Sequence, residues 1–329
     1  MTLIAAFRCY EGVVLCADSQ ETIDIPDRGQ YRVNVNKLEK KEAGDYEVVI
    51  GGGGDGDLVD DFVDQLTDQI SGWAVDLTEE KMRQEIRTFV RHYYEVDVPL
   101  SPAHPDDKNL GFIVCVKRKS GTEIFLWRVK GLRVFPVYDK TILGWEEAIY
   151  WHEVNRLYQP NWVSNHAMLL GLHLFAIAKA TSNVISGETK VLLVRDNGIH
   201  VIPSEDIQEL EKMLNAFNRM VDDLRLVLPN MSIPLDEFRV YVIDFKDRVI
   251  DLHERLLGRS MEDMLTRSLT DPNYKGDPYP RVAPGTRARV GGTAGGYHFE
   301  DKGEGASGWA SPSHAPPEDE FNDSEEEVK

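Results

Sequence analysis

Along most of the chain, short apolar runs alternate with longer stretches in which apolar residues recur every three or four positions. Short runs between turn residues are typical of buried strands, and a spacing of three and four is typical of amphipathic helices. Strands are therefore predicted at residues 3–9, 13–18, 47–50, 110–116, 123–129, 132–138, 189–194 and 199–202. Helices are predicted at residues 58–73, 79–94, 146–158, 164–182, 204–220 and 235–257.

The order of these elements predicts the fold class. Strands come first, a helix pair follows, strands return, and a second helix pair precedes the last two strands, which an Asp196-Asn197-Gly198 turn joins as a hairpin. Strands and helices in separate runs favour antiparallel sheets covered by helices over a parallel sheet of βαβ units. We therefore expect an α+β protein, a four-layer αββα sandwich of two stacked antiparallel sheets with a C-terminal helical extension.

Composition divides the chain into three parts. Residues 1–214 carry the predicted sandwich, residues 215–270 a helical extension, and residues 271–329 are rich in Gly, Pro, Ser and acidic residues without a sustained apolar period. Such a segment cannot bury enough apolar surface to order itself, so a disordered acidic tail is expected. The tail could bind a basic partner, although a solvated tail that aids solubility is the favoured interpretation. A truncation after Ser204 is expected to impair assembly more than folding.

The formal charge of −19 narrows the classes of partner. Negative charge repels phosphates and anionic lipid, so neither a nucleic acid nor a membrane is an expected partner. The chain begins with an acidic turn where a signal peptide needs an unbroken apolar region, so a cytoplasmic location is expected. The cysteines Cys9, Cys16 and Cys115 lie in apolar runs without metal-ligand spacing, and neither a metal nor another cofactor is expected.

The residue that follows the initiator methionine suggests a chemistry. If Met1 is removed, Thr2 carries a hydroxyl nucleophile and a base on one residue, because its α-amino group has an ordinary pKa of about 7.7–8.0 and can accept the hydroxyl proton. A nearby cation would lower the pKa of that amine, and a cation placed in a core needs a carboxylate to hold it. Lys37 and Asp18 are the candidates for these two roles.

These features resemble those of the proteasome β-subunit group of N-terminal-nucleophile hydrolases, including its bacterial relatives. The pieces that carry the resemblance are "TLIAAF", "EGVVLCADSQET", "NKLEKKEAGDYEVVIGGGGDGD" and, more weakly, "TSNVISGETKVLLV". The family places an aspartate sixteen residues after its nucleophilic threonine, and a lysine fourteen residues before its glycine-rich turn. Thr2 and Asp18 keep the first spacing, and Lys37 and Gly51 keep the second. The resemblance covers residues 2–202 and implies the fold of this hydrolase class.

The resemblance implies a role for each matched residue. Thr2 would be nucleophile and base, Lys37 would lower the pKa of its amine, and Asp18 would orient Lys37. Gly51 would donate its backbone N–H to the oxyanion of the tetrahedral intermediate. The family also implies a self-compartmentalising assembly, so we expect a homo-oligomeric ring that takes peptides or unfolded protein as substrate.

The glycine run "GGGGDGD" has a second interpretation as a phosphate-binding loop. The run lacks the lysine of such loops, and Asp55 and Asp57 would repel a phosphate. The same aspartates suit the N-terminus of the helix predicted to follow, so capping is the favoured interpretation.

Two positions depart from the family pattern. Active members have a serine shortly before the third helix, where Leu143 stands, and an aspartate three residues before a second serine. Asn183 stands at the aspartate position, while Ser186 retains the second serine. The hydrogen-bond network around the amine is therefore incomplete, and loss of each charge-assisted contact costs about 1.5–3 kcal/mol.

Three functions remain open on the sequence alone. The first is a threonine peptidase, the second a catalytically idle proteasome-like scaffold or binding subunit, and the third an amidase that acts on a small amide with the same chemistry. By alignment with the family, the substrate pocket would be formed by Glu21, Val35, Val49 and Gly53. One acidic residue among apolar walls favours apolar or basic side chains at the cleavage position over acidic ones.

Overall fold

The protein is described from a computed structural model that covers residues 2–25, 29–103, 105, 108–144, 147–182, 185–229 and 232–257. Over these residues it is an α+β protein, which confirms the predicted class. None of the helices in the described ranges is long and apolar enough to cross a membrane.

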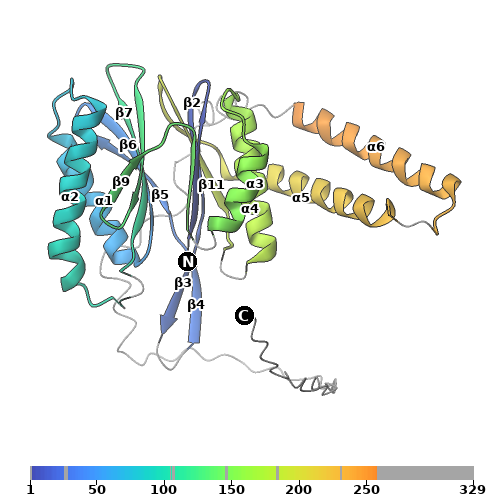
Figure 1. The fold of residues 1–329 in the computed structure, drawn as a ribbon, viewed down its shortest axis with the longest axis horizontal. Helices are drawn as coiled ribbons and strands as arrows, with labels where there is room; N and C mark the ends of the chain where they lie inside the picture. Colours follow the sequence, from blue (N-terminus) through green and yellow to red (C-terminus); the bar gives the residue numbers. More distant parts are fainter. Residues whose placement is uncertain are drawn as a thin grey trace, which may run out of the picture. The chain divides into compact units, whose positions relative to one another are not determined.

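Two five-stranded antiparallel sheets form the centre of the fold (Figure 1). The β1 sheet has the order β10 (Lys140–Gly144), β1 (Leu3–Cys9), β2 (Gly12–Asp18), β11 (Thr189–Arg195) and β12 (Gly198–Val201). The β6 sheet has the order β5 (Leu38–Ala43), β6 (Tyr46–Gly53), β7 (Gly111–Arg118), β8 (Ile124–Lys130) and β9 (Arg133–Pro136). A separate two-stranded ribbon pairs β3 (Gln20–Ile25) with β4 (Gly29–Asn34).

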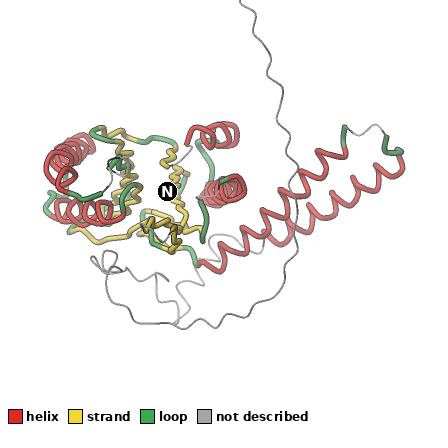
Figure 2. Tube along the Cα trace, turned by 90° about the horizontal axis from the view of Figure 1, so that it is seen from below, coloured by secondary structure: helices red, strands yellow, loops and turns green. Residues whose placement is uncertain are grey.

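Helices cover the outer face of each sheet, as the view in Figure 2 also shows. α1 (Gly56–Ser71) and α2 (Glu79–Leu100) pack on the β6 sheet, and α3 (Glu147–Leu157) and α4 (Ser164–Thr181) pack on the β1 sheet. α5 (Ser204–Val227) contacts α4 and β11, and α6 (Leu235–Leu257) packs along α5.

The side chains of β1 alternate between two separate cores. Leu3, Ala5 and Phe7 pack toward α3 and α4, whereas Ile4 and Ala6 pack between the two sheets. This alternation is the period of two that a strand with both faces covered requires. It determines which way the residues at the start of β1 point, and hence the environment of Thr2.

The strands predicted from apolar runs are present, but the two-stranded ribbon and two edge strands were not predicted. The predicted strand 3–9 and the "DNG" hairpin are confirmed, but β3, β4, β5 and β10 were not predicted. β5 is an edge strand whose sequence LEKKEA has four charged residues, a composition typical of edges protected from aggregation. β10 is a short edge strand on the opposite sheet.

The first part of α5 belongs to the core, and the remainder does not. Ile207, Leu210 and Met213 are buried, while no described side chain after Met213 is fully buried. A cut after Ser204 would therefore remove three core side chains. The expectation that this cut impairs assembly more than folding stays a prediction. The boundary placed at residue 214 stays a prediction, and the acidic tail from residue 271 lies outside the described residues.

Candidate active site

A buried ion pair between Asp18 and Lys37 lies at the end of the β1 sheet where β1 begins. Asp18 is the last residue of β2, and its Oδ2 lies 2.7 Å from Lys37 Nζ. Its Oδ1 accepts the backbone N–H of Leu3, the first residue of β1, at 2.9 Å. Asp18 is fully buried, and the Lys37 side chain is 5% exposed. The aspartate therefore links the lysine to the residue that directly follows Thr2.

Burial perturbs both charges of this pair. Loss of solvation raises the pKa of the Asp18 carboxyl, and the Lys37 ammonium and the Leu3 N–H oppose that rise. Loss of solvation lowers the pKa of the Lys37 amine, against the effect of Asp18 and of the nearby Glu21 carboxylate. Removing one partner of such a pair leaves an uncompensated buried charge. Each group is therefore needed to keep the other ionised.

Thr2 lies directly before β1, half-buried, on the face of the strand that points toward the β6 sheet. Ile4, two residues later, packs between the sheets and sets this direction. A Cβ built on Gly53, at the end of β6, would lie 3.3 Å from Thr2 Cβ and 3.7 Å from its Oγ1. A Cβ on Gly51 would instead meet Leu38 Cδ2 at 2.8 Å and Ile4 Cδ1 at 3.1 Å. Gly53 thus faces the threonine side chain, and the role of Gly51 as an oxyanion donor stays a prediction.

Strand β10, which pairs with β1, ends beside the backbone of Thr2. Gly144 ends β10 with a φ of +141°, and a Cβ there would lie 2.0 Å from the Thr2 carbonyl oxygen, so only glycine fits. Leu143 pairs with Ile4 and packs between the sheets, where its Cδ1 would lie 2.6 Å from a Cβ on Gly111. The position that the resemblance assigns to a serine is therefore an apolar core position. Gly144 was not predicted as a site residue, because its only indication in the sequence is its place at the end of an apolar run.

The loop that carries Ser186 packs on Ser19, the residue after the buried aspartate. Glu188 donates its backbone N–H to Ser19 Oγ at 2.8 Å. Gly187 has a φ of +79°, and a Cβ there would lie 2.5 Å from the same oxygen. Ser186 is thereby held, half-buried, at the end of the sheet that contains the ion pair. The other departing position, Asn183, lies outside the described residues.

The residues predicted to line a substrate pocket differ in their accessibility. Glu21 is half-buried on β3, close enough to the lysine of the ion pair to raise its pKa. Val35 is half-buried and donates its backbone N–H to the Ser19 carbonyl at 2.6 Å. Val49 is fully buried in the core between the sheets. Their role in substrate binding, like that of Gly53, stays a prediction.

The glycine run ends in a helix cap. Asp55 is the N-cap of α1, where its side chain accepts the backbone N–H of Leu58 at 3.1 Å, and Asp57 lies in the first turn. The prediction that these aspartates cap the helix is confirmed, since carboxylates stabilise the positive end of a helix.

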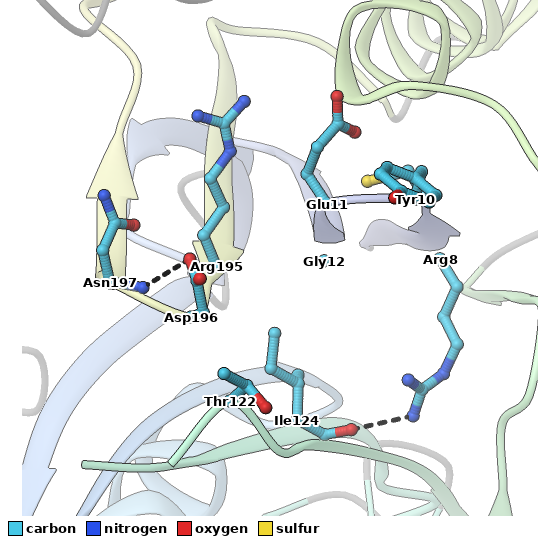
Figure 3. A pocket seen from close by; sticks show the side chains of 10 residues that line it. Arg8, Tyr10, Glu11, Gly12, Thr122, Ile124, Arg195, Asp196 and Asn197 are labelled. Carbon is cyan, nitrogen blue, oxygen red and sulfur yellow. Dashed lines mark hydrogen bonds between the residues drawn. The ribbon is translucent and has the colours of Figure 1, made fainter. Parts of the chain in front are cut away.

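A pocket of about 670 Å³ lies at the opposite end of the β1 sheet, around the β1–β2 and β11–β12 turns (Figure 3). Its charged side chains already have partners: Arg8 donates to the carbonyls of Val137 and Ile124, and Arg195 donates to Ser164 Oγ. Since β1 separates this pocket from Thr2, the pocket is not part of the candidate site. Within the described ranges, no group of three or more His, Cys, Asp or Glu residues is arranged to hold a metal ion.

Comparison with known proteins finds solved structures of similar fold but no protein of similar sequence. The chain matches no protein-family model and no curated protein. Among solved structures it is similar to Anbu from Pseudomonas aeruginosa, described as a helical assembly of the Anbu complex, with a TM-score of 0.57 and 16% identity over 71% of this chain and 99% of that one. It is also similar to Anbu from Yersinia bercovieri, described as an ancestral β-subunit, with a TM-score of 0.56 and 14% identity over 70% of this chain and 100% of that one.

A third similar structure is a Gly-1 mutant of Anbu from Hyphomicrobium sp. strain MC1, with a TM-score of 0.54 and 15% identity over 71% of this chain and 99% of that one. At such identities the likeness is one of fold. It agrees with the proteasome-like fold that the resemblance of Thr2, Asp18, Lys37 and Gly51 to the β-subunit pattern implies.

Proposed function

We propose that the chain is a proteasome-like threonine peptidase with the four-layer αββα sandwich of N-terminal-nucleophile hydrolases, and that Thr2 becomes its first residue after removal of Met1. The observation that carries the proposal is the bridging position of Asp18, which holds Lys37 Nζ at 2.7 Å and the N–H of Leu3 at 2.9 Å. A buried cation tied to the residue beside a hydroxyl nucleophile suits a chemistry that requires a neutral amine at working pH.

In the proposed reaction the free α-amine of Thr2 takes the proton from its own Oγ as that oxygen attacks the substrate carbonyl carbon. The carbonyl electrons move to the oxygen, and the N–H of Gly51 would stabilise the oxyanion. When the tetrahedral intermediate collapses, the C–N bond breaks and the ammonium returns its proton to the leaving amine. Water, deprotonated by the same amine, then attacks the ester carbonyl carbon. The C–O bond to Thr2 Oγ breaks, the ammonium returns its proton to Oγ, and the acid product is released.

Lys37 has an electrostatic role in this scheme. The ordinary pKa of an α-amine, about 7.7–8.0, leaves much of it protonated at neutral pH, and a nearby ammonium lowers that pKa. Asp18 would keep Lys37 charged and oriented, while Ser186 and Asn183 would support the amine by hydrogen bonds. Asn183 cannot carry the charge of an aspartate, so a slower enzyme is the proposed result.

We propose that the active form is a homo-oligomer, with peptides or unfolded protein as substrate. One of the similar structures is described as a helical assembly of the Anbu complex, which supports oligomerisation of a chain with this fold. Exposed apolar residues on α6, among them Val240, Ile243 and Ile250, offer a surface for such contacts.

A catalytically idle scaffold is the second candidate, and Leu143 favours it. The family serine at that position is replaced by a side chain that is 5% exposed in the core between the sheets. A site without that serine has one fewer group to support the amine. The scaffold would keep the fold and the contacts between subunits while lacking hydrolysis.

The experiment that decides between the two begins with the intact mass of the purified protein. The peptidase proposal requires loss of Met1 and covalent addition of an epoxyketone or β-lactone probe to the N-terminal peptide. Thr2→Ala should abolish the adduct, and Thr2→Ser should retain it, because serine keeps the hydroxyl. A protein that retains Met1, or a processed protein that takes no probe, supports the scaffold and refutes the peptidase.

The substrate preference can be measured with a fluorogenic peptide panel. Peptides with an apolar or basic residue at the cleavage position should be cleaved faster than acidic ones, because an acidic side chain near Glu21 would be repelled. Glu21→Gln should reduce the preference for basic over apolar residues. Fastest turnover of acidic peptides would contradict the assignment, and turnover of small amides alone would indicate an amidase.

A further inference from the structure

We propose that Gln208 and Glu211 of α5 are positioning residues for the Asp18–Lys37 pair and act through the loop of residues 185–188 and Ser19. The inference rests on the proposed function, because it assigns a role in the same site. Neither residue belongs to the segment that resembles the hydrolase family, which ends at residue 202. Both lie on the helix that follows the last strand of the β1 sheet.

Ser19 links the loop to the two chain segments that carry the members of the ion pair. Ser19 directly follows Asp18, and its carbonyl accepts the N–H of Val35 at 2.6 Å, two residues before Lys37. Its hydroxyl accepts the N–H of Glu188 at 2.8 Å. Ser19 is 2% exposed, so water cannot readily replace these partners. A shift of the loop would therefore move the chain segments that carry Asp18 and Lys37.

Helix α5 holds this loop from its outer side. Gln208 Nε2 donates to Glu188 Oε1 at 2.8 Å, so the residue bound to Ser19 through its backbone is bound to α5 through its side chain. A glutamine amide has two donors and one acceptor in a planar group, which fixes direction as well as distance. The loop is thus held between α5 and Ser19, and we call the contacts of Gln208 and Glu211 that hold it the α5 clamp, or simply the clamp.

Glu211 adds a second attachment one turn further along α5. Its Oε1 accepts Lys179 Nζ at 2.7 Å and the hydroxyl of Thr189, and Lys179 Nζ also donates to that hydroxyl at 2.8 Å. Lys179 lies near the end of α4 and Thr189 begins β11, so the network ties both ends of the chain segment that contains the loop. Thr189 is 1% exposed and is the register partner of Asp18. The clamp therefore has one anchor on the loop and one on the strand beside the ion pair.

The first test measures the clamp without relying on activity. Hydrogen exchange of the full-length protein, followed by mass spectrometry, reports the Glu188 amide that donates to Ser19. Glu211→Gln should speed exchange of peptides covering residues 185–190 by about tenfold, and Gln208→Ala should do the same. Glu205→Gln is the matched control, because Glu205 is exposed on the same helix and should leave this exchange unchanged. Unchanged exchange in both variants would overturn the proposal.

The second test separates a positioning role from a merely structural one. The rate of probe addition to Thr2 is measured against pH in the wild type, the two variants and the control. If the clamp positions Lys37, the two variants place the ammonium less well, and the pKa of the Thr2 amine rises. The curve of labelling rate against pH should then shift to higher pH in these two variants and not in the control. Faster exchange with an unshifted curve would leave only a structural clamp and overturn the positioning role.

Two outcomes distinguish this inference from the proposed function on which it rests. If the wild type takes no probe at any pH, the peptidase proposal fails and the positioning role fails with it, whatever the exchange shows. If the wild type is labelled but the variants keep the wild-type exchange and pH curve, the peptidase stands and only the inference fails. Gln208→Ala keeps the test valid should Glu211→Gln unfold, because it removes no charged residue and leaves the pair of Glu211 with Lys179 intact.

Discussion

Substitution of Lys37 by methionine is the sharpest test of the buried ion pair. The change removes the ammonium 2.7 Å from Asp18 Oδ2 and leaves a fully buried carboxyl that still accepts the N–H of Leu3. Breaking a buried pair on one side costs about 3–5 kcal/mol, against about 0–1 kcal/mol for a surface pair. We expect Lys37→Met to lower the free energy of unfolding by about 3–5 kcal/mol at pH 7.5. Lys130→Met is the control, because the Lys130 side chain is 52% exposed and its partner Glu147 keeps Arg128, so the change should cost less than about 1 kcal/mol.

The pH dependence of the Lys37→Met defect follows from the pKa of Asp18. Burial already raises this pKa, and loss of Lys37 raises it further, above the unfolded value of about 3.9. A carboxyl whose pKa is raised by folding stabilises the protein below the unfolded pKa and loses that contribution as pH rises to the folded pKa. The deficit relative to the wild type should therefore be small at pH 4.5 and largest at pH 7.5.

Urea unfolding at a fixed protein concentration measures this deficit, with tryptophan fluorescence as reporter, because Trp127 and Trp73 are buried in the core. The double variant Asp18→Asn with Lys37→Met should recover most of the loss at pH 7.5, because asparagine keeps an oxygen for the Leu3 N–H and carries no charge. A Lys37→Met deficit below about 1 kcal/mol that does not change with pH would refute the argument that the pair is buried and interdependent.

Further predictions concern packing near Thr2 and the helical extension. Gly51→Ala should lower the free energy of unfolding by about 1–3 kcal/mol in urea titrations, because its Cβ would lie 2.8 Å from Leu38 Cδ2. Gly53→Val should slow probe labelling of Thr2 by about 100-fold with little change in melting temperature, since a Cβ there already lies 3.3 Å from Thr2 Cβ; an unchanged labelling rate would contradict the placement. Truncation after Val227 should shift the melting temperature by less than about 4 °C, because no described side chain of α6 is fully buried, and calorimetry with size-exclusion chromatography would show whether only assembly changes.

The sequence predicted those features of the fold and site that depend on local pattern. The apolar run of β1 and the cap at Asp55 involve neighbouring residues, and both were predicted. Asp18 and Lys37 were selected by spacing and family resemblance, and the structure brings them together. Edge strand β5 was missed because exposed charges obscure a strand pattern.

Contacts between distant segments could not be predicted in the same way. The bond from Glu188 to Ser19 joins positions 169 residues apart, and neither residue has a local signature of that contact. The fit of Gly144 against the carbonyl of Thr2 likewise depends on the pairing of β1 with β10. Such contacts follow from the register of the whole sheet, which is determined by all of its strands together.

Helix α5 contributes to the core in its first turns and leaves it after Met213. A protein engineer who wishes to exchange the helical extension with that of another chain should therefore place the junction after this residue rather than at the end of β12. A graft made at β12 would replace the side chains that fill the core together with those that clamp the loop beside Asp18. Residues beyond the junction can vary in length and composition at much lower cost, because they carry no fully buried side chain among those described.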